Sequence, residues 1–263
     1  MNDTNPDDNH LQPVPPPSTL TPTPPQNAQP VIRPSRFRQA PLTLAIIAFT
    51  AFIYLLQVIS NSWLGYDLPE LLMVKINELI LQGQLWRLVT PLLLHGSLVH
   101  IGMNMYALFI IGPGIERNYG RIRYLELYLM AGIFGNIFSF LFTSEASLGA
   151  STAIFGLIAA QAVYIYRNRQ FFGRAARPML MNILFIVMIN IFIGFLPGID
   201  YWGHLGGLTG GLFFAWLAGP TYTVTDTLFG PQLSEKKGFS STTIFILELI
   251  LAASLVLIKF IFR

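Results

Sequence analysis

The sequence predicts an all-α, polytopic membrane helix bundle with about seven transmembrane helices. Hydrophobic residues make up 53% of the 263 residues and charged residues only 11%, whereas soluble domains carry about 25% charged residues. The hydrophobic residues stand in blocks of about 20, the length that crosses about 30 Å of hydrocarbon. Composition and block length together are typical of a helix bundle embedded in a bilayer.

Seven blocks qualify as candidate spans. The fourth block is short for a span, and the sixth is interrupted by glycines. The seven candidates, in chain order, are roughly 41–60, 92–112, 124–142, 150–166, 179–196, 203–219 and 242–262.

Basic residues alternate along the chain in a way that predicts orientation. They precede the first span and follow the second, fourth and sixth spans, whereas the long 61–91 connection holds only Lys75 and Arg87. Loops rich in Lys and Arg stay on the cytoplasmic side. We therefore expect a multi-pass protein of the cell membrane with a cytoplasmic N-terminus and, with seven spans, an external C-terminus.

The chain divides into three predicted segments. Residues 1–40 hold ten of the 18 prolines and almost no aromatic residues, so we expect a disordered cytoplasmic tail. Residues 41–220 form a predicted six-helix core. Residues 221–263 form a predicted cytoplasmic loop and the seventh span.

Few residues could perform chemistry inside this bundle. The chain has no cysteine, which excludes disulfides, thiolate metal sites and a cysteine nucleophile. In the predicted orientation, five polar side chains lie in the outer leaflet: His95, His100 and Asn104 on span 2, Ser151 on span 4 and His204 on span 6. Polar groups in hydrocarbon are costly and usually face a bundle interior or a wet cavity.

Ser151 and His204 form a candidate nucleophile and base. A serine hydroxyl is a weak nucleophile and needs an adjacent base. His204 opens HLGGLTGG, and Gly207 and Gly211 are spaced to let two membrane helices pack closely. Most such glycine pairs serve packing alone, and a lone serine in a membrane helix usually bonds its own backbone. The shared depth of Ser151 and His204 favours the catalytic interpretation.

Three donors could stabilise an oxyanion beside Ser151. His100 and Asn104 are four residues apart and share one helix face. The backbone N–H of Ser151 is free of a helical partner in the first turn. The alternative is a polar clamp between spans 2 and 4.

No acidic residue clearly completes a triad. Asp200 stands four residues before His204 and could orient its imidazole, but a solvated loop position is the alternative. Phe155 follows Ser151 by one helical turn, and its ring could stack on His204. The sequence therefore favours a Ser-His dyad.

The ordered set of motifs resembles the rhomboid family of intramembrane serine proteases. The resemblance covers about residues 86–211. Its motifs are Trp86-Arg87, HGSLVHIGMN at 95–104, GPGIERNYG at 112–120, GAS at 149–151 and HLGGLTGG at 204–211.

The resemblance implies a role for each matching residue. Ser151 would be the nucleophile, His204 the general base, and His100, Asn104 and the Ser151 amide the oxyanion hole. The implied supporting residues are Gly149, Phe155, Gly207, Gly211, Trp86, Arg87 and Glu116.

The resemblance also implies partners and a mechanism. The substrates would be transmembrane proteins in the lipid bilayer, span 5 would be a mobile lateral gate, and span 7 would make this the six-plus-one form. No metal, cofactor or nucleic acid is expected. Two residues depart from the family pattern: Thr152 stands where Gly is frequent, and its bulk is expected to narrow the pocket or slow turnover, and Phe155 stands where Tyr is common.

Two other functional classes are the alternatives to a protease. An inactive rhomboid-like binding protein would have lost Ser151 or His204, and both are present. A transporter or channel is disfavoured because the second half does not repeat the first and because Glu126 and Glu248 lie near span ends.

Overall fold

A computed structural model describes residues 40–227, 230–236 and 238–262 of the chain. Within these ranges the chain is mostly helical, with one two-stranded hairpin, which confirms the predicted all-α class. Apart from Ala40, the predicted tail at 1–40 lies outside the described residues. The elements in chain order are α1 (Pro41–Leu64), α2 (Leu68–Met73), α3 (Asn77–Leu81), the 3₁₀ turns Leu85–Leu88 and Thr90–Leu93, α4 (Leu98–Tyr119), α5 (Arg121–Phe142), α6 (Ser151–Arg167), α7 (Arg169–Phe172), the 3₁₀ turn Gly173–Ala175, α8 (Ala176–Ile193), α9 (Tyr201–Ala218), β1 (Tyr222–Thr227), β2 (Gly230–Glu235) and α10 (Ser241–Ile261).

Five of the described helical segments are long and apolar enough to cross a membrane. They are α1, α4, α5, the segment Arg169–Ile193 that contains α8, and α10. The remaining two predicted spans, α6 and α9, are 17 and 18 residues long and are not among the five. The count of seven spans therefore stays a prediction.

The predicted boundaries of the second span, 92–112, are wrong at both ends. Thr90–Leu93 forms a 3₁₀ turn, and α4 begins only at Leu98, after Ser97 in an extended conformation accepts a hydrogen bond from the His100 N–H. At the other end Pro113 lies inside α4, which continues to Tyr119. His95 consequently precedes the helix, because the serine cap and not hydrophobicity decides where α4 starts.

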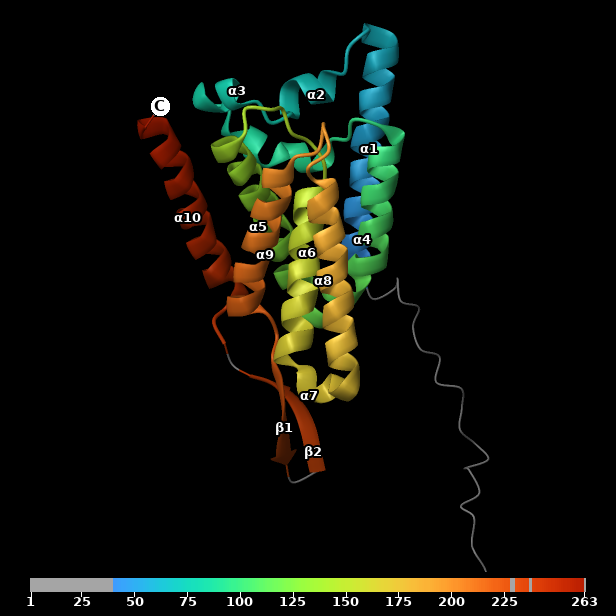
Figure 1. Ribbon diagram of the computed structural model, residues 1–263, viewed down its shortest axis with the longest axis vertical. Helices are drawn as coiled ribbons and strands as arrows, with labels where there is room; N and C mark the ends of the chain where they lie inside the picture. The colour runs from blue at the N-terminus through green and yellow to red at the C-terminus, as the bar shows by residue number, and fades with distance from the viewer. Residues whose placement is uncertain (1–39, 228–229, 237, 263) are drawn as a thin grey trace, which may run out of the picture. The chain divides into compact units, whose positions relative to one another are not determined.

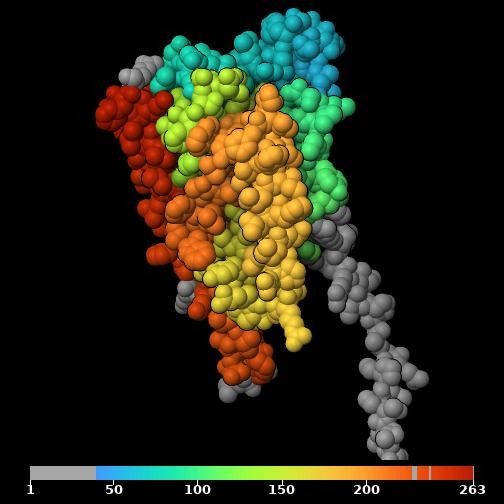
Figure 2. Space-filling model, viewed as in Figure 1, coloured from blue at the N-terminus to red at the C-terminus, as the bar shows by residue number. Residues whose placement is uncertain are grey.

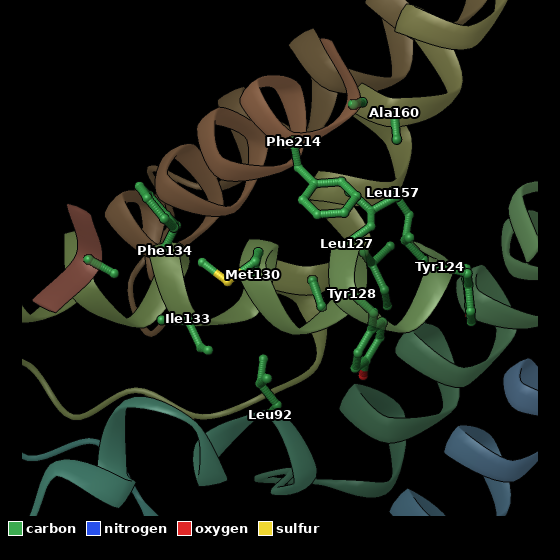
Figure 3. Close-up of a cluster of buried hydrophobic side chains, with 14 of the residues drawn as sticks. Leu92, Tyr124, Leu127, Tyr128, Met130, Ile133, Phe134, Leu157, Ala160 and Phe214 are labelled. Carbon is green, nitrogen blue, oxygen red and sulfur yellow. The ribbon is translucent and has the colours of Figure 1, made fainter. Parts of the chain in front are cut away.

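Three helices form the centre of the bundle (Figure 1). α9 packs most extensively against α5 and then against α6, and α5 also packs on α6. Figure 3 shows Phe214 of α9, Leu157 of α6 and Leu127 of α5 in the buried cluster that joins them. In contrast, α1, α8 and α10 carry few buried residues.

The glycines of α9 divide between two faces. On the face toward α5, Gly206 and Gly210 lie against Phe134 and Phe138, and a methyl group on either glycine would come within 2.7 Å of these phenylalanines. The large side chains of α5 thus fill the space that the small residues of α9 leave open.

On the face toward α6, backbone meets backbone. A methyl group on Gly207 would overlap the carbonyl group of Thr152, and one on Gly211 would overlap Gly156. Small residues permit this close approach between membrane helices. The residue that follows Ser151 is therefore held against the first turns of α9.

Glu116 ties α4 to the start of α1. Its carboxylate accepts hydrogen bonds from the backbone N–H groups of Leu42 (3.0 Å) and Thr43 (2.8 Å) and from the Thr43 hydroxyl (2.7 Å). A buried carboxylate at a helix N-terminus satisfies orphan N–H groups and complements the helix dipole. The GPGIERNYG motif thus places an acidic cap on a different helix.

Trp86 and Arg87 organise the connection between α1 and α4. The Arg87 guanidinium donates to the carbonyl oxygens of Val74 (2.6 Å) and Leu71 (2.8 Å), and the Trp86 indole N–H donates to that of Leu72 (3.1 Å). Both side chains therefore close the loop on itself by binding its backbone carbonyls.

Lys75 fastens this connection to the end of α5. Its fully buried ammonium donates to the carbonyl oxygens of Ser139, Thr143 and Glu145, and its backbone pairs with that of Ser147. Burial lowers the pKa of Lys75 to about 8. These contacts hold the segment that leads from α5 into Ser151.

The predicted loop before the seventh span contains a β-hairpin that the sequence analysis missed. Strands β1 and β2 pair antiparallel from Tyr222↔Glu235 to Thr227↔Gly230. Glu235 forms an ion pair with Arg123 of α5 at 2.8 Å. The division into segments 1–40, 41–220 and 221–263 stays a prediction.

Candidate active site

Ser151 is the first residue of α6, and the glycine two positions earlier makes the entry into the helix. Gly149 has φ +126°, a conformation that residues with a side chain rarely adopt. Its N–H donates to the carbonyl oxygen of Pro91 at 2.9 Å. The small residues of LGASTAIFG therefore serve two purposes: they bend the chain ahead of the hydroxyl and they let α6 pack closely.

His204 lies in the first turn of α9 and faces this hydroxyl. Its Nε2 is 2.9 Å from the Oγ of Ser151, although 53 residues separate the two in sequence. Both residues are half-buried. The packing of α6 on α9 at Gly207 thus brings together the two residues that the sequence analysis paired.

Asp200 caps α9 instead of bonding the imidazole. Its Oδ1 accepts from the Gly203 N–H at 2.8 Å, and its carbonyl oxygen accepts from the His204 N–H at 3.1 Å. Within the described part of the chain, the buried Nδ1 of His204 has no hydrogen-bond partner. The arrangement is a pair of side chains with no carboxylate bonded to the imidazole.

The ring of Phe155 lies parallel to the His204 imidazole. The ring centroids are 4.4 Å apart and the planes differ by 16°. Phe155 stands one turn after Ser151, so one helix supplies both the hydroxyl and the ring. Stacking on Phe155 therefore fixes the plane of the imidazole, and the hydrogen bond to the Ser151 Oγ fixes the direction of its Nε2.

His100 and Asn104 of α4 approach the chain just before Ser151. A methyl group on Gly149 would lie 2.8 Å from the His100 Nε2 and 3.6 Å from the Asn104 Nδ2. The Asn104 Nδ2 is buried and, within the described residues, has no hydrogen-bond partner. A buried unpaired donor costs free energy unless a ligand or water satisfies it.

His95 lies behind this group. Its ring meets that of His100 edge to face at 5.0 Å, and its Nε2 accepts a long hydrogen bond of 3.5 Å from the Ala150 N–H. Burial lowers the pKa of His95 to about 4, with a smaller contribution from His100. His95 is therefore neutral at pH 7 and can serve as this acceptor.

The arrangement can perform nucleophilic chemistry. A hydroxyl lies within hydrogen-bond distance of an imidazole, and two side-chain donors approach the backbone beside it. The N–H of Ser151 lies in the first helical turn, where no i−4 carbonyl is available. No group of three or more His, Asp or Glu residues that could hold a metal ion was found within the described ranges.

The expectation that Thr152 narrows the pocket is wrong. Thr152 is 3% exposed and packs into the space left by Gly135 of α5 and Gly203 of α9. Its side chain lies between these helices because the two glycines leave room for it. Sequence analysis missed Gly135 and also Pro91, whose carbonyl oxygen anchors Gly149; Pro91 stands only four residues before the histidine motif.

Comparison with known proteins agrees with the motif order. A family model described as "Rhomboid domain" matches residues 82–221. The chain is 40% identical over 174 residues to "Rhomboid protease GluP" of Bacillus subtilis, covering 66% of this chain and 34% of that protein.

Two plant proteins are also similar to this chain. "RHOMBOID-like protein 9, chloroplastic" of Arabidopsis thaliana is 31% identical over 164 residues, covering 62% of this chain and 38% of that protein. "RHOMBOID-like protein 5" of the same plant is 33% identical over 178 residues, covering 65% and 57% respectively. The match thus spans between about one third and just over half of these relatives' lengths.

We expect Gly207→Ala to destabilise the protein, because its new methyl group overlaps the Thr152 carbonyl and forces α6 from α9. Overpacking of this kind costs about 1–3 kcal/mol. The measurement is the midpoint of thermal unfolding in detergent. Gly114→Ala is the matched control, since a methyl group there meets nothing within 4 Å. Equal midpoints for the two variants would contradict the close contact.

Proposed function

Because this chain belongs to the rhomboid family, we propose that it is an intramembrane serine endopeptidase that cleaves other membrane proteins within or beside their transmembrane segments. The observation that carries the proposal is the 2.9 Å approach of the Ser151 Oγ to the His204 Nε2. The name of the B. subtilis relative, a rhomboid protease, supports the same activity.

In the proposed mechanism, Ser151 attacks the scissile carbonyl carbon while His204 removes its proton. The resulting imidazolium then donates that proton to the departing amine, leaving an acyl-enzyme on Ser151. Water, deprotonated by His204, attacks the acyl carbon, and the imidazolium returns its proton to the departing Ser151 Oγ, which releases the new carboxyl terminus and restores the free enzyme. Water must therefore reach the site.

The negative charge that develops on the carbonyl oxygen needs donors. The unpaired Nδ2 of Asn104, the ring of His100 and the N–H of Ser151 are the proposed oxyanion hole. Donors oriented before reaction do not need to reorganise as charge develops, which is why they accelerate acyl transfer. A role in the oxyanion hole also explains why the buried Asn104 Nδ2 has no hydrogen-bond partner among the described residues. In a polar clamp between two helices, this amide would be hydrogen-bonded to the other helix.

Phe155 is proposed to substitute for the orienting carboxylate of a triad. Its stacked ring holds the imidazole plane, while Asp200 is occupied at the start of α9. The dyad then depends on ring packing for its orientation.

The proposed substrates are transmembrane helices. Their scissile carbonyls are held in i→i−4 hydrogen bonds, so a substrate must unwind locally before attack, and breaking these bonds is costly in hydrocarbon. We propose α8 as the lateral gate. Among its 18 residues only Ala176 is buried, and Figure 2 shows its surface open along one face of the molecule.

The proposed orientation has a cytoplasmic N-terminus and a site that opens outward in the cell membrane. A reporter active only outside the cytoplasm should remain inactive when fused near residue 172 and become active when fused after residue 263. Activity of the reporter fused near residue 172 would mean that α6 crosses the membrane in the opposite direction, and it would refute the proposed release of products on the outer side.

Labelling with a fluorophosphonate serine probe tests the nucleophile. We expect the full chain to be labelled, and Ser151→Ala and His204→Ala to fall to background while their unfolding midpoints stay near wild type. Ser254→Ala is the matched control, an exposed serine of α10 that should leave labelling unchanged. A folded wild-type chain that neither takes the probe nor cleaves a transmembrane substrate would favour the inactive binding protein instead.

Asn104→Ala should lower kcat by about 10- to 1000-fold, the usual effect of removing one oxyanion donor. KM should change little, because the lost hydrogen bond forms with the charge that develops in the transition state. Initial rates on a transmembrane substrate measure both constants. A kcat within twofold of wild type would reject the role.

A further inference from the structure

A cavity lined by arginines lies at the end of α6 remote from Ser151. Its volume is about 850 Å³, and its wall runs from Tyr166 through α7 to the first turns of α8. Figure 1 places α7 at the opposite end of the bundle from α2 and α3. Sixteen helical rises along α6 separate Ser151 from Arg167, about 24 Å, so this cavity is distinct from the proposed active site.

Three arginines in the wall have no acidic partner within the part of the chain that the structure describes. Arg169, Arg174 and Arg177 are exposed and line the cavity. Across the described residues the one ion pair joins Arg123 to Glu235. No Asp or Glu lines the cavity, so its positive charge is not neutralised from within.

Arg167, which precedes these three arginines in the chain, differs from them because its guanidinium is hydrogen-bonded to the backbone of α9. Arg167 donates to the carbonyl oxygens of Trp216 (2.6 Å) and Gly219 (3.4 Å) and so closes α6 on the end of α9. Arg169 instead lies over the Tyr166 ring, 5.1 Å from its centroid. Its guanidinium edge remains available to a ligand.

The cavity changes character along α8. Arg174, in the 3₁₀ turn before α8, and Arg177, in its first turn, contribute charge to the wall, whereas Leu180 and Met181, one turn further along α8, contribute apolar surface. A free anion would need only the arginines. A ligand that has both an anionic phosphate and a hydrocarbon chain matches both parts of the wall.

We propose that this cavity binds the phosphate headgroup of an anionic phospholipid, with the first part of an acyl chain along Leu180 and Met181. Anionic lipids concentrate in the cytoplasmic leaflet, on the side where the basic loops are expected. The lipid bridges α7 to the base of α8. Any effect on proteolysis through the gate rests on the proposed function, but binding itself does not.

The test measures lipid retention on the full chain in detergent by native mass spectrometry. Wild-type protein should retain phosphatidylglycerol at least tenfold more tightly than phosphatidylcholine, and the double variant Arg174→Gln/Arg177→Gln should lose at least tenfold of that affinity, since each arginine near an anionic surface contributes about fivefold. The matched control is Arg117→Gln/Arg121→Gln. Both of these arginines are exposed and line no part of the cavity, and we expect unchanged retention.

Three outcomes would overturn the proposal. The first is equal retention of both lipids by the wild-type protein. The second is an equal loss of retention in the control variant, which would indicate general electrostatic attraction. The third is displacement of the lipid by inorganic phosphate at the same concentration, which would identify a free-anion site. Because binding is measured without substrate or probe, its failure is distinguishable from failure of the proposed peptidase activity.

Discussion

The close contact of α9 with α5 and α6 is the constraint on which the rest of this structure depends. Between membrane helices there is little hydrophobic driving force, because lipid tails are as apolar as the side chains. Contact must come from fit, and α9 achieves it with one pair of glycines facing the phenylalanines of α5 and a second pair facing the backbone of α6. The distance between Ser151 and His204 is a consequence of this second pair, because both residues stand in the first turns of the two helices that it joins.

The polar groups at that end of the bundle follow a common logic. Several are bonded: the Lys75 ammonium to three carbonyl oxygens, the Asp200 Oδ1 to the N–H of Gly203, and the N–H of Gly149 to the carbonyl oxygen of Pro91. The buried Nδ2 of Asn104 and Nδ1 of His204 have no partner among the described residues, and the same is true of the His95 Nδ1, the Thr152 Oγ1 and the Asp200 Oδ2. An unpaired buried polar group costs about 1–3 kcal/mol. A reacting carbonyl oxygen would satisfy such a donor, and the Asn104 amide also lies beside Gly149, two residues before Ser151, which is why it supports the proposed oxyanion hole.

The bundle separates a packed centre from lightly held outer helices. α5 carries buried residues along most of its length, whereas α8 carries one and α10 four. A well-packed centre keeps the serine and imidazole in register, and a lightly packed outer helix can move with little loss of contact. The cavity at the base of α8 belongs to this outer layer, so a lipid bound there would act on α8 without disturbing the core.

The sequence by itself determined the helical class, the approximate positions of the seven longest helices and the pairing of Ser151 with His204. The helices could be predicted because hydrocarbon requires every backbone group of a spanning segment to be hydrogen-bonded internally, which makes long apolar blocks helical. The pairing of Ser151 with His204 was predicted from their shared depth in the bilayer. The sequence also predicted that Phe155 could lie beside His204, from helical periodicity alone. Only the tertiary structure decided which way each small or polar residue faces. Thr152 lies between α5 and α9 because Gly135 and Gly203 make room for it, Asp200 caps α9, α4 begins at its serine cap, and residues 222–235 form a hairpin. Each of these depends on the rotation of a helix about its axis or on a partner distant in sequence, and neither is encoded in local hydrophobicity.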